Sequence, residues 1–128
     1  MSIFGLGSDI VDTNRIKKAL KNKNFIKKIF SKNELKIIKA KLKTSINYCA
    51  KRFAAKEAFS KALGTGISGG ISFKDISINN DKKGRPYIKL IGKTKSIVQR
   101  TIKKRYKIFL TLTDEKKYAF AILVIATK

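Results

Sequence analysis

Apolar residues alternate with polar or small ones at the start of the chain, which predicts a β-strand over Ile3–Val11. Gly5, Gly7 and Asp9 fall on one face of this strand. Because the two glycines leave open space beside Asp9, we expect another backbone or a ligand to come close to that face. Taken alone, the same pattern also fits a bulged edge strand with a solvated aspartate.

The next part of the chain has the spacing of amphipathic helices. Asp12 or Thr13 is expected to cap the first helix, and Thr44 or Ser45 the last. Between them, Ser31-Lys32-Asn33-Glu34 forms a capping box. The predicted helices cover residues 12–21, 31–42 (with Leu35, Ile38 and Leu42 inward) and 44–63, with a break at 22–24 and helical spacing over 25–30.

Strand patterns dominate the remaining sequence. Two strands, Ile71–Asn79 and Pro86–Ile91, are predicted to form a hairpin around the turn Asn80–Gly84. A helix follows over 93–104, and two final strands, 106–113 and 118–126, flank the turn at 114–117. This order predicts a single α+β domain over residues 1–128, with a mainly antiparallel sheet and packed helices.

The stretch Arg52–Gly66 contains the most informative residues. It predicts a helix with Gly64 as a left-handed C-terminal cap. At about 100° per residue, Glu57 and Lys61 share a face with small and apolar residues. A carboxylate on such a packed face needs a partner, which is either Lys61 or a metal ion.

Basic residues and glycines surround this glutamate. Arg52 and Lys56 stand one turn apart on another face, which suggests two cations with the same direction. The loop Gly64–Gly70 follows a helix, whereas a phosphate-binding P-loop precedes one, so it is not a P-loop. A carboxylate, several cations and a glycine-rich loop together predict a site for a metal-bound phosphate.

Composition limits the metal and the compartment. The 128 residues include one cysteine, Cys49, which excludes an internal disulfide and is expected to be a core thiol in a reducing compartment. With no histidine, an ordinary zinc site is excluded, and oxygen-ligated magnesium or calcium remains. No signal peptide is expected, and the longest apolar run, Tyr118–Ala126, is too short to span a bilayer. We therefore expect a cytoplasmic protein.

The net charge of +23 indicates a polyanionic partner: nucleic acid, an anionic membrane or an acidic protein. The lysines are spread along the chain, and part of the charge also fits compositional drift. A small basic nucleic-acid-binding protein is the alternative function. It has no zinc finger or aromatic RNA-binding motif to support it, and it leaves Asp9 and Glu57 unexplained.

Several motifs together resemble the holo-acyl-carrier-protein synthase family, the small phosphopantetheinyl transferases. The strongest is the run from Phe53 to Gly66, and the opening run Gly5–Val11 with Arg15-Ile16 also matches. Further matches, in the expected order, are Phe30-Ser31 with Glu34-Leu35, Phe73 with Asp75-Ile76, and Gly84-Arg85-Pro86-Tyr87.

This resemblance implies a phosphopantetheinyl transferase-like fold and a magnesium-dependent reaction in fatty acid biosynthesis. The 4′-phosphopantetheine arm of coenzyme A would pass to a serine of apo acyl carrier protein, releasing adenosine 3′,5′-bisphosphate. It also implies a homotrimer with active sites between subunits, and Tyr118–Ala126, apolar on both faces, agrees with such an assembly.

The resemblance assigns roles to individual residues. Asp9 and Glu57 would bind Mg²⁺, and Glu57 and Lys61 would be catalytic, with Glu57 as the base. Arg15 and Lys18 would bind the carrier protein. The residues expected to bind coenzyme A are Arg52, Lys56, Lys61, Gly64, Gly66 and Pro86.

One region departs from the family pattern. Family members often have histidines in the strand before the last hairpin, but the matching run here is Phe109–Asp114, and the chain contains no histidine. Asp114 stands where the second histidine would be, so it is a weak candidate for the same role.

Overall fold

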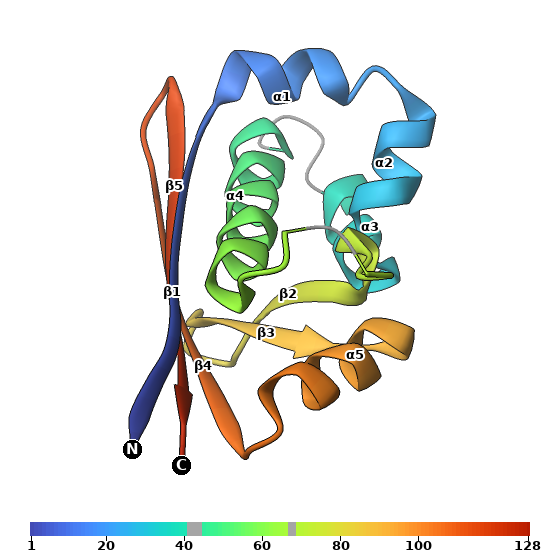
Figure 1. Cartoon of the computed structure of the whole chain (residues 1–128). Coiled ribbons are helices and arrows are strands. Elements are labelled where there is room, and N and C mark those ends of the chain that lie inside the picture. The colour runs from blue at the N-terminus through green and yellow to red at the C-terminus, as the bar shows by residue number, and fades with distance from the viewer. Residues whose placement is uncertain (41–44, 67–68) are drawn as a thin grey trace.

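One long helix, α4 (Ser45–Leu63), runs through the middle of the molecule. In the computed structural model, which describes residues 1–40, 45–66 and 69–128, a three-stranded sheet lies along one side of this helix. The helices α2 and α3 and the hairpin β2–β3 lie on its other side (Figure 1). Helix α4 therefore connects the two halves of the structure.

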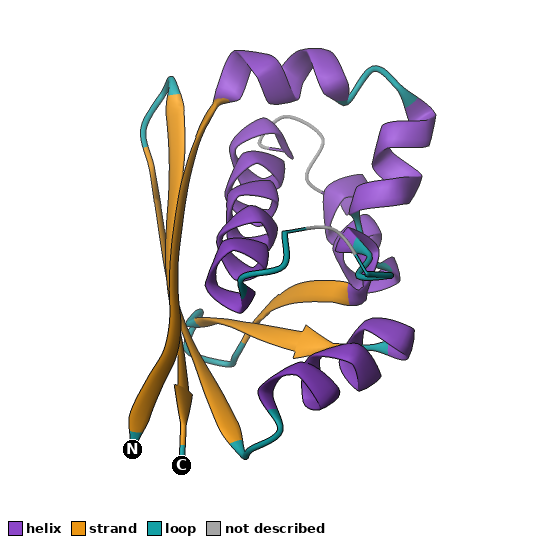
Figure 2. Cartoon of the chain, in the orientation of Figure 1, coloured by secondary structure: helices purple, strands orange, loops and turns teal. Residues whose placement is uncertain are grey.

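Along the chain, one strand is followed by a run of helices, then by a pair of strands, one more helix and a final pair of strands (Figure 2). The chain forms a single α+β domain, as predicted. The helices besides α4 are α1 (Thr13–Ala19), α2 (Lys23–Ile29), α3 (Lys32–Ala40), α5 (Gly92–Ile102) and a 3₁₀ turn, η1 (Phe73–Asp75). The strands are β1 (Ser2–Asp12), β2 (Ile76–Asn80), β3 (Pro86–Leu90), β4 (Tyr106–Asp114) and β5 (Tyr118–Thr127).

Both sheets of the described residues are antiparallel, as the sequence predicted. The larger sheet has the order β1–β5–β4, so β5 is its central strand. The register pairs Asp9, on the edge strand β1, with the buried Ala121 of β5, so both residues lie on the same face of the sheet. Alternate residues of β5, from Ala119 to Ile125, are buried, because this face of the sheet packs on α4.

Two predicted helix starts are confirmed in detail. The Asp12 carboxylate accepts a hydrogen bond from Asn14 N, 2.8 Å away, and so caps α1. The capping box before α3 is also present, because Ser31 N donates to Glu34 Oε1 and Glu34 N donates to Ser31 Oγ. The predicted end of α3 at Leu42 and the candidate cap Thr44 lie outside the described residues.

The prediction of a strand over residues 71–79 is wrong at its beginning. Residues 73–75 form the 3₁₀ turn η1, and β2 begins only at Ile76. The carbonyl oxygens of Phe73 and Ile76 both accept hydrogen bonds from the ammonium group of Lys56. These carbonyls therefore point into the core, where the side chain of a residue distant in sequence satisfies them.

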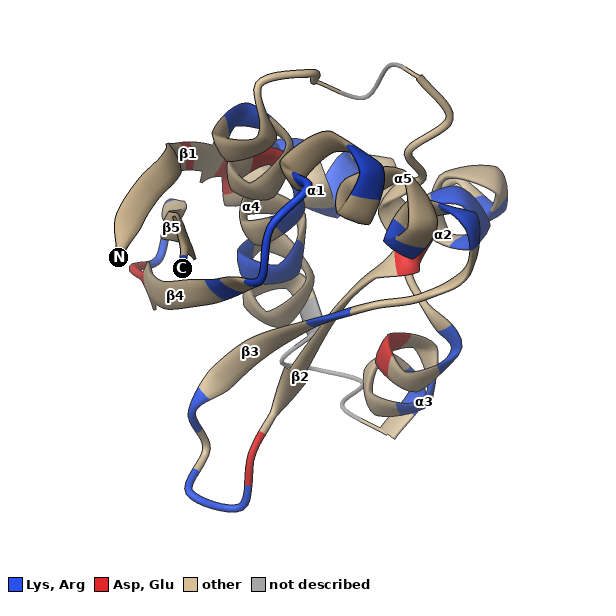
Figure 3. Cartoon of the chain, turned by 60° about the horizontal axis from the view of Figure 1, so that its bottom comes forward, with Lys and Arg blue, Asp and Glu red and all other residues tan. Residues whose placement is uncertain are grey.

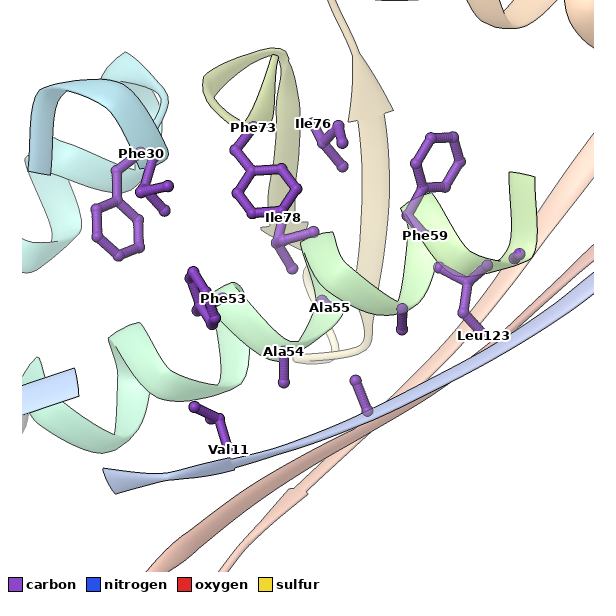
Figure 4. Close-up of a cluster of buried hydrophobic side chains, with 14 of the residues drawn as sticks. Val11, Phe30, Phe53, Ala54, Ala55, Phe59, Phe73, Ile76, Ile78 and Leu123 are labelled. Atoms are coloured by element: carbon purple, nitrogen blue, oxygen red, sulfur yellow. The ribbon is translucent and has the colours of Figure 1, made fainter. Parts of the chain in front are cut away.

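The core is built on α4, which is buried on most of its circumference. Its alanines, including Ala54 and Ala58, are fully buried and allow close packing. Phe53 contacts Phe73 edge to face, with ring centroids 5.9 Å apart (Figure 4). The ring centroids of Phe53 and Phe25 are 6.0 Å apart. These aromatic contacts fix η1 and α2 against the helix.

None of the described helices combines the length and the apolar character that a membrane crossing requires.

Candidate active site

The site begins with an unusually close contact between β1 and α4. A Cβ atom on Gly5 would lie 1.8 Å from Ala62 O, and one on Gly7 would lie 1.9 Å from Ala58 O. Any side chain at either position would therefore collide with the helix backbone. This confirms the expectation that the glycine face of the strand admits another backbone, and it places Asp9 directly beside α4.

Asp9 meets Lys61 across this contact. Lys61 Nζ lies 3.1 Å from Asp9 Oδ1 and 3.1 Å from the carbonyl oxygen of Ser8. The Asp9 side chain is only 16% exposed, whereas that of Lys61 is 56% exposed. A largely solvated ammonium group therefore covers a partly enclosed carboxylate.

Glu57 lies one turn before Lys61 and belongs to the same cluster. Burial raises the pKa of its carboxyl, and the negative charge of Asp9 raises it further. The cations Lys61 and Arg15 act in the opposite direction. Two carboxylates that repel each other, next to a removable ammonium group, suit a divalent cation.

The potential ligands are of the chemical type that magnesium prefers. Asp9 and Glu57 provide hard carboxylate oxygens, and the described residues contain no cluster of three or more potential acidic, cysteine or histidine ligands. A magnesium ion here would take its remaining ligands from water or from phosphate oxygens, as is common for Mg²⁺ bound with nucleotides.

The prediction that Lys56 binds coenzyme A is corrected by its position. Its side chain is fully buried, and Nζ lies 2.8 Å from Glu34 Oε1. The same ammonium group donates to the carbonyls of Phe73 and Ile76 at 2.8 and 2.6 Å. All three of its donors are used inside the protein, so it has none left for a ligand.

Arg52 is also buried, but its environment is different. Its guanidinium lies 4.0 Å from the ring centroid of Tyr48 and donates to Asn80 Oδ1 at the end of β2. Within the described part of the chain, Arg52 Nε has no hydrogen-bond partner. The sequence prediction of two cations aimed in one direction is therefore wrong, because Arg52 and Lys56 have separate partners.

The glycines predicted to bind coenzyme A follow Lys61 directly. Gly64 ends α4 with a φ of +88°, and Gly66 has a φ of +61°. Both have positive φ values, which favour glycine, and nothing lies within 4 Å of a Cβ built on either. Pro86, in contrast, pairs with Asn80, whose side chain accepts a hydrogen bond from Arg52 in the N-terminal half of α4.

The two groups of predicted coenzyme A residues are therefore far apart. The twelve steps along the chain from Arg52 to Gly64, at the rise of an α-helix, correspond to about 18 Å. The larger sheet covers one side of α4. The helices α2 and α3 and the hairpin β2–β3 lie on the other side (Figure 1). Within the described part of one chain, a compact ligand at Gly64 would therefore not also contact Arg52.

The residues assigned to the carrier protein lie on α1. Arg15 and Lys18 are both exposed. The Arg15 guanidinium lies 5.9 Å from the Phe53 ring centroid, and its charge lowers the pKa of Glu57. Arg15 thus lies at the edge of the carboxylate cluster. The periodicity of α1 alone does not predict that Arg15 is near Glu57.

Asp114 is held by two residues of α4. Asn47 Nδ2 donates to Asp114 Oδ2 at 2.7 Å, and Lys51 Nζ lies 3.2 Å from Oδ1. The hydrogen bond from Asn47 is the main reason why the pKa of Asp114 is lowered. At the position of the missing family histidine, this carboxylate ties the end of β4 to the helix.

Sequence comparison identifies the family. A model of the 4′-phosphopantetheinyl transferase superfamily matches residues 5–123. The chain belongs to this superfamily. The match covers both Asp9 on β1 and the α4 residues Glu57 and Lys61, so the resemblance stated from the motifs is confirmed.

Curated relatives narrow the assignment within the superfamily. A holo-[acyl-carrier-protein] synthase from Pelagibacter ubique is 48% identical over 133 residues, which cover 100% of both chains. The corresponding synthase from Photobacterium profundum is 43% identical over 98% of both. The prediction that this phosphopantetheinyl transferase is a holo-acyl-carrier-protein synthase is therefore confirmed.

Solved structures of such synthases share the fold. The Neisseria meningitidis synthase superposes with a TM-score of 0.87 at 36% identity, covering 98% of this chain and 99% of that one. The Bacillus anthracis synthase, described as a complex with CoA (3′,5′-ADP), has a TM-score of 0.82 at 35% identity and covers 100% of both chains.

Proposed function

We propose that this transferase moves the 4′-phosphopantetheine arm of coenzyme A to a serine of apo acyl carrier protein and releases adenosine 3′,5′-bisphosphate. The observation that carries the proposal is the cluster of Asp9, Glu57 and Lys61 at the β1–α4 contact, in a chain of this family. The relatives' names supply the substrates, and the cluster provides groups suited to phosphoryl transfer.

In this proposal, Asp9 and Glu57 hold Mg²⁺, which when bound offsets the negative charge of the pyrophosphate. Lys61 exchanges its contact with Asp9 for a phosphate oxygen and neutralises developing charge. Glu57, whose pKa is raised, is suited to accept the proton of the serine hydroxyl. The serine oxygen bonds to the phosphorus that carries pantetheine, and the bond from this phosphorus to the adenosine bisphosphate breaks.

Arg52, Gly64, Gly66 and Pro86 remain the proposed contacts for coenzyme A. Arg52 Nε has no hydrogen-bond partner among the described residues, which supports a role for this side chain in binding an anion. Because Gly64 and Gly66 follow the C-terminal end of α4, whereas Arg52 and Pro86 lie along its N-terminal half, we propose that each site combines the Gly64 region of one subunit with the Pro86 region of a neighbour.

A homotrimer, the assembly implied by the resemblance, would bring the Gly64 region of one subunit and the Pro86 region of the next together. The outer face of the larger sheet supports association, because large apolar side chains on all three strands are exposed there: Phe4, Leu6, Ile10, Phe109, Tyr118 and Ile122. Light scattering at micromolar concentration should give three times the chain mass. A monomer mass would contradict this part of the proposal.

Acyl carrier proteins are acidic, and α1 offers them a basic surface. Arg15 and Lys18 are three residues apart, so they are neighbours on one helical surface. The other lysines and arginines are spread over several helices and the β2–β3 loop (Figure 3), as the sequence suggested. The family assignment favours an acidic protein partner over the alternative of nucleic acid.

The direct test is transfer of the arm from coenzyme A to an apo carrier protein, followed as a mass increase of the carrier. Activity that requires both Mg²⁺ and the serine of the carrier would support the proposal. A carrier mass that stays unchanged with the folded protein, coenzyme A and Mg²⁺ present would overturn it.

A further inference from the structure

A cavity lies on the side of α4 away from β1 and its Asp9. It encloses about 550 Å³, a volume typical of small-molecule sites. Its walls come from α2, α3, η1, β2 and β3, which Figure 1 places away from β1. The residues that line it are Lys27, Phe30, Ser31, Lys32, Asn33, Leu35, Lys74, Asp75, Ser77, Lys89 and Ile91.

Four lysines surround this cavity: Lys27, Lys32, Lys74 and Lys89. All four are exposed, and in the described part of the chain none forms an ion pair with a carboxylate. They come from four different elements, so the fold brings them together from distant parts of the sequence. Their positive charges repel each other unless an anion lies between them.

Asp75 is the one acidic residue among the lining residues, and its carboxylate is already engaged. Asp75 Oδ2 accepts a hydrogen bond from Thr94 Oγ1, 3.0 Å away at the start of α5. The lining residues therefore have a formal charge of +3, since four lysines oppose one aspartate. The cavity favours an anionic ligand by charge complementarity.

The inner wall of the cavity combines apolar side chains with two buried hydroxyl groups. Phe30 is buried, Leu35 and Ile91 are half-buried, and together they line the cavity with carbon. The hydroxyls of Ser31 and Ser77 lie 2.8 Å apart and hydrogen-bond to each other. A ligand that fits both features has an anionic group near the lysines and an apolar body against the inner wall.

We propose that this cavity, which we call the lysine cavity, binds a small phosphate ester with an apolar or aromatic body. It contains none of the residues assigned to catalysis or to coenzyme A, so it is a site separate from the one proposed for transfer. Removal of its lysines should leave the Asp9–Glu57–Lys61 cluster intact.

Phenyl phosphate is a suitable probe, and binding can be followed by NMR of the backbone amides in the full chain. Saturable shifts are expected at Ser31, Lys32 and Lys74. Because the apolar wall contributes to binding, phenyl phosphate should bind about tenfold more tightly than inorganic phosphate. Equal affinity for the two probes would overturn the proposal.

Two matched double variants separate the cavity from the general charge of the protein. K32Q/K74Q should weaken phenyl phosphate binding about tenfold, because each lost ammonium removes a charge-assisted contact. K95Q/K104Q, which removes two exposed lysines that do not line the cavity, should leave binding unchanged. Equal weakening by both pairs, or shifts confined to the residues around Glu57, would overturn the proposal.

If K32Q/K74Q loses its dispersed amide spectrum, the single variant Lys89→Gln takes its place. It alters the β3 wall of the cavity at an exposed position. Weaker binding in a folded Lys89→Gln protein supports the site, and unchanged binding contradicts it.

Discussion

Lys56 and Glu34 form an ion pair in which both side chains are fully buried, with Nζ and Oε1 2.8 Å apart. The Glu34 carboxylate also accepts hydrogen bonds from Ser31 N and Ile78 N. One pair of charges thus connects α4 to the start of α3 and to β2. Burial lowers the pKa of Lys56, and the charge of Glu34 opposes that shift.

Removing one member of this pair should be costly. We expect Lys56→Met to reduce the free energy of unfolding by about 3–5 kcal/mol, because it leaves a buried carboxylate without its countercharge. Lys51→Met is the matched control, because its pair with Asp114 is partly exposed and should contribute about 1 kcal/mol or less. Urea denaturation measures both, and equal losses would contradict the prediction.

The metal assignment is tested by isosteric changes in the two carboxylates. Asp9→Asn and Glu57→Gln should each lower magnesium-dependent transfer about a hundredfold or more while the protein stays folded. Asp12→Asn is the control, because it changes an exposed carboxylate on the same strand and asparagine also caps helices well. Full activity in both Asp9→Asn and Glu57→Gln would refute the assignment.

The raised pKa of Glu57 predicts a specific dependence on pH. In the folded protein the group holds its proton to a higher pH than its ordinary value of 4.5. Between pH 4.5 and the raised pKa of Glu57, the folded state binds more protons than the unfolded state. The free energy of unfolding therefore falls as pH rises through this window. Magnesium affinity should rise over the same window, because the metal requires the ionised carboxylate.

Calorimetric titration with Mg²⁺ at a series of pH values measures this effect. Glu57→Gln should remove the dependence on pH in this window, because the titrating group is gone. Asp9→Asn should lower the pKa of Glu57, since the charge of Asp9 raises it in the parent protein. A pKa of Glu57 that does not change in Asp9→Asn would contradict the proximity of the two groups.

The contact between β1 and α4 can be tested by adding a single methyl group. Gly7→Ala should destabilise the protein by about 1–3 kcal/mol, because its Cβ would lie 1.9 Å from Ala58 O and force the strand away. Such a shift should also weaken transfer, since Asp9 would move relative to Glu57. Ser8→Ala, at an exposed position of the same strand, should change neither property, and an unaffected Gly7→Ala would be the contrary result.

The basic surface of α1 should control the encounter with the carrier protein. Lys18→Glu is expected to raise the KM for the carrier and leave the KM for coenzyme A unchanged, because exposed charges mainly set the association rate. An increase from about 50 to 500 mM salt should have the same effect on the parent protein. Lys104→Glu is the control on another surface, and equal effects of both changes would show a role for net charge only.

Arg15→Glu should differ from Lys18→Glu in one respect. Because the charge of Arg15 lowers the pKa of Glu57, its reversal should raise this pKa as well as the KM for the carrier. The pH profile of transfer therefore separates the two variants. Identical pH profiles would indicate that Arg15 acts only in docking.

Local sequence patterns predicted much of the site. Alternation along β1 placed Gly5, Gly7 and Asp9 on one face of the strand, and helical spacing placed Glu57 and Lys61 on one face of α4. These patterns were sufficient because each depends only on the periodicity of side chains within its own strand or helix. The capping box of Ser31 and Glu34 was also visible, since all its atoms lie within four residues.

Tertiary structure alone decided the direction of Lys56 and the start of β2. Spacing shows which residues of a helix share a face, but α4 is covered on both sides, so spacing does not reveal which lysine enters the core. Lys56 does so because Glu34, Phe73 and Ile76 provide oxygens there, 17–22 residues away in the sequence. Contacts at that separation depend on how the elements pack, and no local pattern records them.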